Sequence, residues 1–217
     1  MSGTGARPRR TQRERTEATT GQLLAAAREL FARDGYAATS LDDVTAAAQV
    51  TKGALYHHFS SKRELFRAVC AVEQERLTRR QSEAFRSQDD PWQGFAAGCE
   101  AYLEGVSEPG VQRILLLDAP GVLGWEGIRE LEAQTHAMSI EGVRRAMSAK
   151  RLPRRDPAPL VELVFGALGA AAMAIARAPT DDAAAVRRAM AREIRRLLDG
   201  LAVSDGPSAP PPRRTRR

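Results

Sequence analysis

Apolar side chains recur every three or four residues along almost the whole chain, which is the spacing of one face of an α-helix. The first such stripe runs from Leu23 to Phe31, and the Asp34-Gly35 pair is expected to end that helix. No segment shows the sustained apolar–polar alternation, rich in β-branched residues, that is typical of a half-buried strand. The pattern therefore predicts an all-α fold of about nine helices.

Capping residues and helix breakers place the other predicted helices. The Ser40 hydroxyl can cap a second helix that ends near Ala48, and Thr51 can cap a third that ends at His57 or His58. A fourth begins at Ser60 or Ser61 and continues to about residue 85. The remaining predicted helices cover 92–106, 111–118 (ended by Pro120-Gly121), 125–149, 160–178 and 182–202, with a proline-rich loop at 152–159.

The net charge of +6 is concentrated towards the two ends of the chain. Residues 1–80 and the proline-rich segment 203–217 are both basic, whereas the body between them is slightly acidic. A basic N-terminal third indicates an anionic partner for that third. The alternative is that the terminal arginines only improve solubility. We expect a disordered basic arm at 1–16, a disordered tail at 203–217, and domains at 17–77 and 78–202 between them.

The sequence argues against an enzyme, a metalloprotein and a membrane protein. The cysteines, Cys70 and Cys99, lack the Cys-x-x-Cys spacing of a zinc site, and no paired carboxylates, phosphate-binding loop or Ser/His/Asp set is evident. We therefore expect no catalytic residue, no metal and no cofactor. The longest apolar run, 163–176, is shorter than the roughly 20 residues of a membrane span. Since no signal peptide is evident either, we expect a soluble, cytoplasmic protein.

Residues 36–66 have the pattern of a helix-turn-helix, in which two short helices are joined by a turn of a few residues. The second of these helices has small side chains on its outward face, so it can enter the major groove of DNA, where base edges are distinguishable. Alternatively, the pair is only a packing unit. The side chains that can bury between the helices are Leu41, Val44, Ala48, Val50, Leu55 and Phe59, and those left facing outward are Lys52, Gly53, Ala54, Tyr56 and His57.

The same segment resembles the DNA-binding domain of the tetracycline-repressor (TetR) family of bacterial transcription regulators, over about residues 17–77. The matching residues are Phe31, Gly35, Tyr36, Thr39, Ser40, Gly53, Leu55-Tyr56-His57-His58-Phe59, Lys62 and Leu65. Within the family, the resemblance implies phosphate contacts from Tyr56 and Lys62, and a helix N-terminus at Thr39 and Ser40 that points at the DNA backbone. The positions implied to face the bases are Lys52, Gly53, Ala54 and His57, and Thr51 at the start of the same helix completes the expected DNA-binding set.

The turn between the two helices departs from the family pattern. Gln49 stands where members usually have glycine, and Thr45 stands where they often have alanine. A non-glycine residue in a left-handed turn conformation costs roughly 1 kcal/mol. We expect the chain to tolerate that strain at Gln49.

Beyond residue 78 the resemblance extends only to helical content, and it implies a small-molecule effector and a homodimer built on residues 160–202. Gly166, Ala170 and Ala174 repeat every four residues, which allows close approach of a second helix. The alternative is that helix 160–178 is the central helix of a monomer. The candidate effector-binding residues, each of which could instead be plain core, are Trp92, Phe95, Tyr102, Asp118, Trp125, His136, Met138, Phe165 and Met173.

Together these patterns predict a sequence-specific DNA-binding transcriptional regulator, a repressor that a small apolar ligand releases from a palindromic, double-stranded DNA operator. The alternative is an architectural protein that binds any duplex through its basic ends. The two differ because a repressor binds one operator much more tightly than random DNA.

Overall fold

The computed structural model describes residues 12–203, and none of these residues lies in a β-strand, so the all-α prediction is confirmed. Residues 1–11 of the predicted arm and 204–217 of the predicted tail lie outside the described residues. The helical segments are α1 (Gln12–Ala38), α2 (Leu41–Ala48), α3 (Lys52–His58), α4 (Lys62–Arg86), α5 (Pro91–Gly105), α6 (Pro109–Val111), the π-helix η1 (Gln112–Asp118), α7 (Ala119–Ser148), α8 (Pro157–Arg177) and α9 (Ala183–Leu201).

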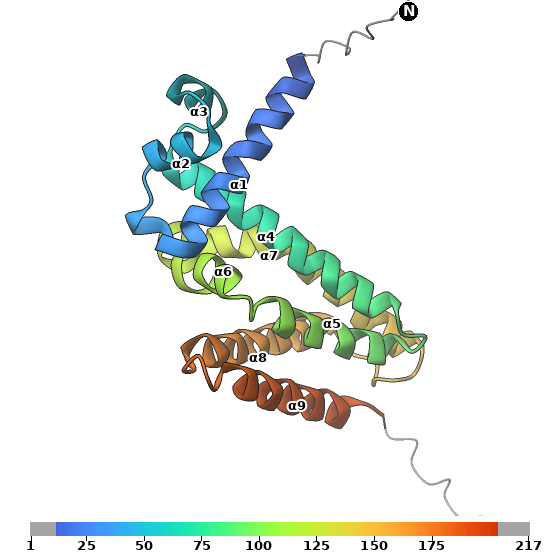
Figure 1. The fold of residues 1–217 in the computed structure, drawn as a ribbon. Helices are drawn as coiled ribbons and strands as arrows, with labels where there is room; N and C mark the ends of the chain where they lie inside the picture. Colours follow the sequence, from blue (N-terminus) through green and yellow to red (C-terminus); the bar gives the residue numbers. More distant parts are fainter. Residues whose placement is uncertain (1–11, 204–217) are drawn as a thin grey trace, which may run out of the picture.

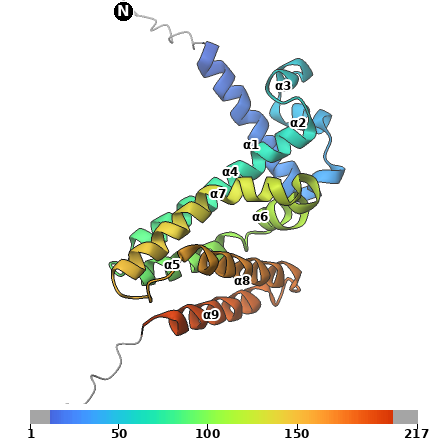
Figure 2. The same cartoon turned by 180° about the vertical axis from the view of Figure 1, so that it is seen from behind.

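Helix α4 runs along the length of the molecule, and the other helices are arranged along it. Figures 1 and 2 show α1, α2 and α3 gathered at one end of the molecule, with α8 and α9 side by side at the other. Helix α4 starts among the N-terminal helices and then runs into the body, where it packs against α5 and α7. One continuous helix therefore belongs to both ends, across the domain boundary predicted at residues 77 and 78.

The N-terminal end is built around an aromatic pair that joins α1 to α4. The rings of Phe31 and Phe66 meet edge to face, with centroids 5.0 Å apart, and both side chains are fully buried. The same hydrophobic cluster includes Ile114 and Ala119 from η1 and α7. The N-terminal helices are thus packed against the body.

A second core fills the space between α5, α7, α8 and α9. Trp92 stacks on Phe95 with ring centroids 5.2 Å apart, and its indole N–H donates to the carbonyl of Leu198 in α9 (3.2 Å). Helix α8 is long and apolar enough by composition to cross a membrane. Because one of its faces packs into this cluster through residues such as Val161 and Leu168, we interpret it as a core helix.

Two predicted boundaries are wrong. Helix α1 begins at Gln12, inside the segment expected to be a disordered arm. Pro120 does not end a helix, because it lies in the first turn of α7, where the missing N–H of proline costs nothing. The chain instead bends at Gly124, which has φ 73° and ψ 178°.

Gly35 interrupts α1 with φ 83° and ψ 169°, a conformation open essentially to glycine alone. A Cβ at this position would lie 2.1 Å from the Arg113 guanidinium. We expect Gly35→Ala to lower the free energy of unfolding by about 1–3 kcal/mol, measured by urea denaturation. Gly21→Ala, in the same helix with open space around a Cβ, should raise it by up to about 1 kcal/mol. Equal effects of the two substitutions would contradict this account.

Candidate functional site

Side-chain caps hold the two short helices of the helix-turn-helix. Ser40 Oγ accepts from the amide of Asp43 (3.1 Å), and the Asp43 carboxylate accepts from the amide of Ser40 (3.0 Å), which is a complete capping box at α2. Thr51 caps α3 by accepting from the amide of Ala54 (3.2 Å). Gln49, between the helices, has φ 55° and ψ 40°, so the expected left-handed turn without glycine is confirmed.

The apolar side chains predicted to lie between α2 and α3 are buried or half-buried. Val44 and Leu55 are fully buried, Ala48 and Phe59 are nearly so, and Leu41 and Val50 pack at the margin of the same cluster. Because Leu55 anchors α3, the rotation of that helix about its axis is fixed. The opposite face of α3 is therefore presented to solvent.

That outward face carries the side chains expected to contact DNA. Tyr56 is 57% exposed, and Lys52, Gly53 and His57 are exposed, while Ala54 is half-buried. The Lys52 ammonium lies 2.8 Å from the Asp42 carboxylate, with both side chains about two-thirds exposed. A pair this exposed contributes little free energy, so Lys52 remains available to a nucleic acid.

Thr39 and Lys62 are turned inward instead of facing solvent with the rest of the set. The Thr39 side chain is buried, and its hydroxyl donates to the carbonyl of Gly35 (2.8 Å). The Lys62 ammonium donates to the carbonyls of Tyr36 and Thr39, each at 2.9 Å, and lies 4.3 Å from the centre of the Tyr36 ring. In this geometry both residues close the end of α1, and a phosphate contact from Lys62 would have to compete with these carbonyls.

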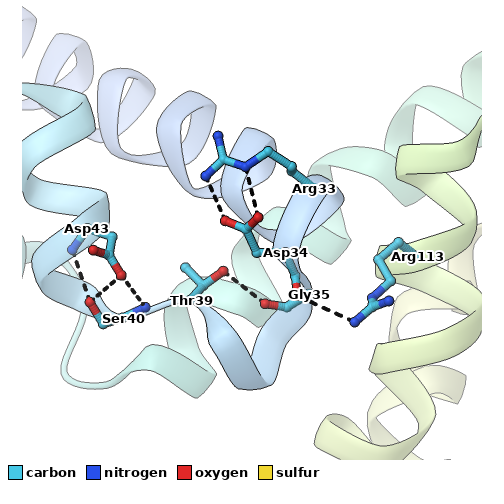
Figure 3. Close-up of polar contacts among 7 residues, drawn as sticks. All are labelled: Arg33, Asp34, Gly35, Thr39, Ser40, Asp43 and Arg113. Carbon is cyan, nitrogen blue, oxygen red and sulfur yellow. Dashed lines mark hydrogen bonds and ion pairs between the residues drawn. The ribbon is translucent and has the colours of Figure 1, made fainter.

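A polar junction joins this end of α1 to the body. The Asp118 carboxylate of η1 accepts from the amide of Tyr36 (2.8 Å) and from Nε of Arg113 (3.3 Å). Arg113 also donates to the carbonyl of Asp34 (3.5 Å), beside the kink at Gly35 (Figure 3). The sequence predicts Asp118 as an effector anchor, and the structure places its carboxylate at this junction instead of in a cavity wall.

A cavity of about 1030 Å³ lies between α4, α5, α7 and α8. Six of the predicted effector-binding residues line it, namely Phe95, Tyr102, Trp125, His136, Met138 and Phe165. Trp92, Met173 and Asp118 do not line it. Trp92 is a buried core residue stacked on Phe95, in keeping with the alternative interpretation that each aromatic is plain core.

The cavity wall also includes polar residues that the sequence pattern does not single out, among them Gln74, Gln81, Glu132 and Glu162. Nε2 of His136 lies 3.0 Å from the Glu162 carboxylate, an ion pair whenever the imidazole is protonated. Burial raises the pKa of the Glu132 carboxyl. The i, i+4 spacing of Glu132 and His136 on one helix was the available signal in the sequence for a shared polar site.

The structure gives no sign of metal or thiol chemistry in the part of the chain it describes. No cluster of metal-ligating side chains occurs among residues 12–203. Burial raises the pKa of the Cys99 thiol, at the cavity wall, to about 12, and that of Cys70 to the same value. Both thiols therefore stay protonated near neutral pH and are poor nucleophiles.

Known proteins are similar to this chain both in the helix-turn-helix and in the helical body. Residues 23–69 match the family described as bacterial regulatory proteins, tetR family, and residues 92–201 match the tetracyclin repressor-like C-terminal domain. A solved TetR-family transcriptional regulator from Pectobacterium atrosepticum is 36% identical, with a TM-score of 0.75 over 89% of this chain and 98% of the other. This chain belongs to the TetR family, whose members are transcription regulators and not enzymes.

Curated relatives match over shorter stretches. The transposon Tn10 TetC protein of Escherichia coli is 28% identical over 57% of this chain and 62% of its own length. The HTH-type transcriptional activator FasR of Mycolicibacterium smegmatis is 40% identical over 39% of this chain. The matches thus span between 38% and 62% of the lengths of these two relatives.

The inward position of Lys62 predicts that its ammonium group contributes to the free energy of unfolding. Lys62→Met removes the ammonium from the carbonyls of Tyr36 and Thr39, so we expect the free energy of unfolding to fall by about 1–2 kcal/mol. Lys52→Met, which removes only an exposed ion pair, should change it by less than about 0.5 kcal/mol. Urea denaturation of both variants measures the difference, and an unaffected Lys62→Met protein would show that Lys62 has no structural role.

Proposed function

We propose that this chain is a sequence-specific DNA-binding transcriptional regulator, a repressor that a small ligand releases from a palindromic operator in the cytoplasm. The observation that carries the proposal is the outward face of α3, where Lys52, Tyr56 and His57 project from a helix whose caps and buried face fix its orientation. A pre-oriented helix of this kind suits the major groove. The relative FasR is named an activator, so a reporter assay decides the direction of regulation.

Dimerisation is part of the proposal because a palindrome must be read by two copies of α3 about one DNA turn apart, roughly 34 Å. The face of α8 that points away from the core supports dimerisation. Leu163 is 74% exposed there, next to exposed Gly166 and Ala170, and Leu197 of α9 is 60% exposed. Apolar side chains this exposed on adjacent helices favour burial against a second copy. The homodimer interface is therefore proposed at residues 160–202.

The cavity supports the effector part of the proposal. Its volume of about 1030 Å³ is large enough for a drug-sized molecule. Gln74, Gln81 and Phe85 of α4 line its wall, while the first residues of α4 lie beside the helix-turn-helix. A ligand in the cavity thus contacts a helix that reaches the proposed DNA-binding face.

Tyr56 and His57, which are neighbours on α3, are proposed to make different DNA contacts, one with phosphate and one with a base. Tyr56→Ala should weaken binding to the operator and to random DNA by the same factor, about 3- to 10-fold, because the hydroxyl is proposed to contact phosphate. His57→Ala should weaken operator binding by about 1–3 kcal/mol with little change on random DNA, because the ring is proposed to face a base. Fluorescence anisotropy with both DNAs measures the four affinities, and a reversed pattern would contradict the assigned roles.

The proposed dimer interface can be tested without disturbing the monomer. Leu163→Arg changes a side chain that is 74% exposed in the single chain, so it should leave the fold intact. It should raise the dimer dissociation constant at least 100-fold, because two buried leucines are lost per dimer at about 1.5–3 kcal/mol each. Leu117→Arg, at a leucine in η1 that is 48% exposed, is the matched control. Sedimentation that finds both variants equally dimeric, or the native chain monomeric at micromolar concentration, would refute the interface.

A further inference from the structure

We propose that the cavity between α4, α5, α7 and α8 binds an aromatic cation, a flat multi-ring molecule that carries one positively charged amine. This inference rests on the proposed role of the cavity as the effector site and names the chemical class of the effector. Three features of the wall carry it: aromatic rings, one half-buried carboxylate, and one buried amide donor, the last two without a hydrogen-bond partner among residues 12–203.

The apolar part of the wall suits a flat ring system. The rings of Phe85, Phe95 and Phe165 come from three different helices and line one cavity. The volume of about 1030 Å³ lies at the upper end of the range for ligand sites. A single small ring would leave most of that space unfilled, so several fused rings fit better.

The carboxylate of Glu132 is the group with which the positive charge of the ligand would pair. Its neighbours on α7, Arg129 and His136, both lie within ion-pair distance of Glu162, at 4.0 and 3.0 Å. Glu132 itself makes no hydrogen bond or ion pair with any residue in the described range 12–203. Burial raises the pKa of its carboxyl, and the nearby positive charges of His136 and Arg129 offset only part of that rise. A half-buried carboxylate without a partner is costly, and a bound ammonium group would offset that cost.

Gln81 requires a complementary acceptor. Its side-chain nitrogen is buried in the cavity wall and has no hydrogen-bond acceptor within the part of the chain that the structure describes. Buried donors of this kind are normally satisfied, so a ligand with a ring nitrogen, ether or carbonyl oxygen would bind better than a pure hydrocarbon. The recognised molecule therefore combines a cationic donor for Glu132 with an acceptor for Gln81.

The arginines around the cavity do not favour an anion instead. Arg145 is 62% exposed and pairs with Glu141 (3.1 Å), and Arg129 is 57% exposed beside Glu162. Arg86 is exposed at the end of α4. Because these guanidinium groups are exposed, and two of them lie beside carboxylates, they do not offer a buried positive charge to an anion, whereas the carboxyl of Glu132 is half-buried at the wall.

Trp125 gives the cavity an aromatic side chain at its margin. It lines the cavity yet is 74% exposed, and it follows directly on the bend at Gly124. An indole ring is the best aromatic partner for a cation. Its fluorescence also reports on occupancy of the cavity.

Three probes that share one ring system test the inference: 1-pyrenylmethylammonium, 1-pyrenemethanol and 1-pyrenecarboxylate. Each is titrated into the full chain without DNA, with Trp125 and pyrene fluorescence as readouts. The ammonium should bind at least 10-fold more tightly than the alcohol, and the carboxylate should bind most weakly. Glu132→Gln should remove the preference for the ammonium while leaving the affinity for the alcohol unchanged. The matched control is Glu126→Gln, an exposed glutamate of α7 outside the cavity wall, which should keep the preference.

The ranking of the three probes on the native chain decides the inference even if Glu132→Gln fails to fold. Equal or tighter binding of the alcohol or the carboxylate would overturn it, as would the absence of binding by all three. A preference for the ammonium that survives in a folded Glu132→Gln protein would also overturn it. Failure of the chain to select a DNA sequence, with the preference for the ammonium intact, would contradict the proposed function and leave the cation site standing.

Discussion

The position of the helix-turn-helix on the body depends on the Asp118 carboxylate. One of its oxygens accepts from the amide of Tyr36 (2.8 Å) and from Arg113 (3.3 Å), so it ties the end of α1 to η1. The contact is possible because Gly35 turns the chain with φ 83° and leaves space for the Arg113 guanidinium. Lys62 closes the same helix end from the other side. A few charged groups around one glycine therefore set the orientation of α2 and α3.

This junction gives the molecule a physical route between cavity and helix-turn-helix. Helix α4 places Gln81 and Phe85 in the cavity wall and Lys62 at the end of α1. Helix α7 similarly contributes Glu132 to the cavity and begins directly after Asp118. Any ligand-dependent shift of these helices acts on the groups that orient α3. A coupling of 1–3 kcal/mol, typical of allosteric proteins, would change DNA affinity about 5- to 150-fold.

The helix-turn-helix could be predicted closely from the sequence, because its caps, breakers and apolar spacing are local signals. Ser40, Thr51 and Ser61 cap the helices at which they were expected, and Gln49 adopts the left-handed turn. The roles of Asp118, Thr39 and Lys62 could not be derived in this way, because they depend on contacts such as that between residues 36 and 118, which no local pattern encodes. The cavity wall could be predicted only in part. The sequence singles out its aromatic residues, but a glutamate such as Glu132 looks like any surface charge until the fold shows which residues surround it.

Selection of bound sequences from random duplex DNA tests most directly whether two copies of this chain read a specific DNA sequence. The experiment uses the full chain at a stated, near-physiological salt concentration, because nonspecific binding weakens steeply with salt. We expect enrichment of one palindrome whose half-site centres lie one helical turn, about 10 base pairs, apart or a multiple of that distance. Binding of the random pool without enrichment of any sequence would contradict the account and favour the architectural alternative.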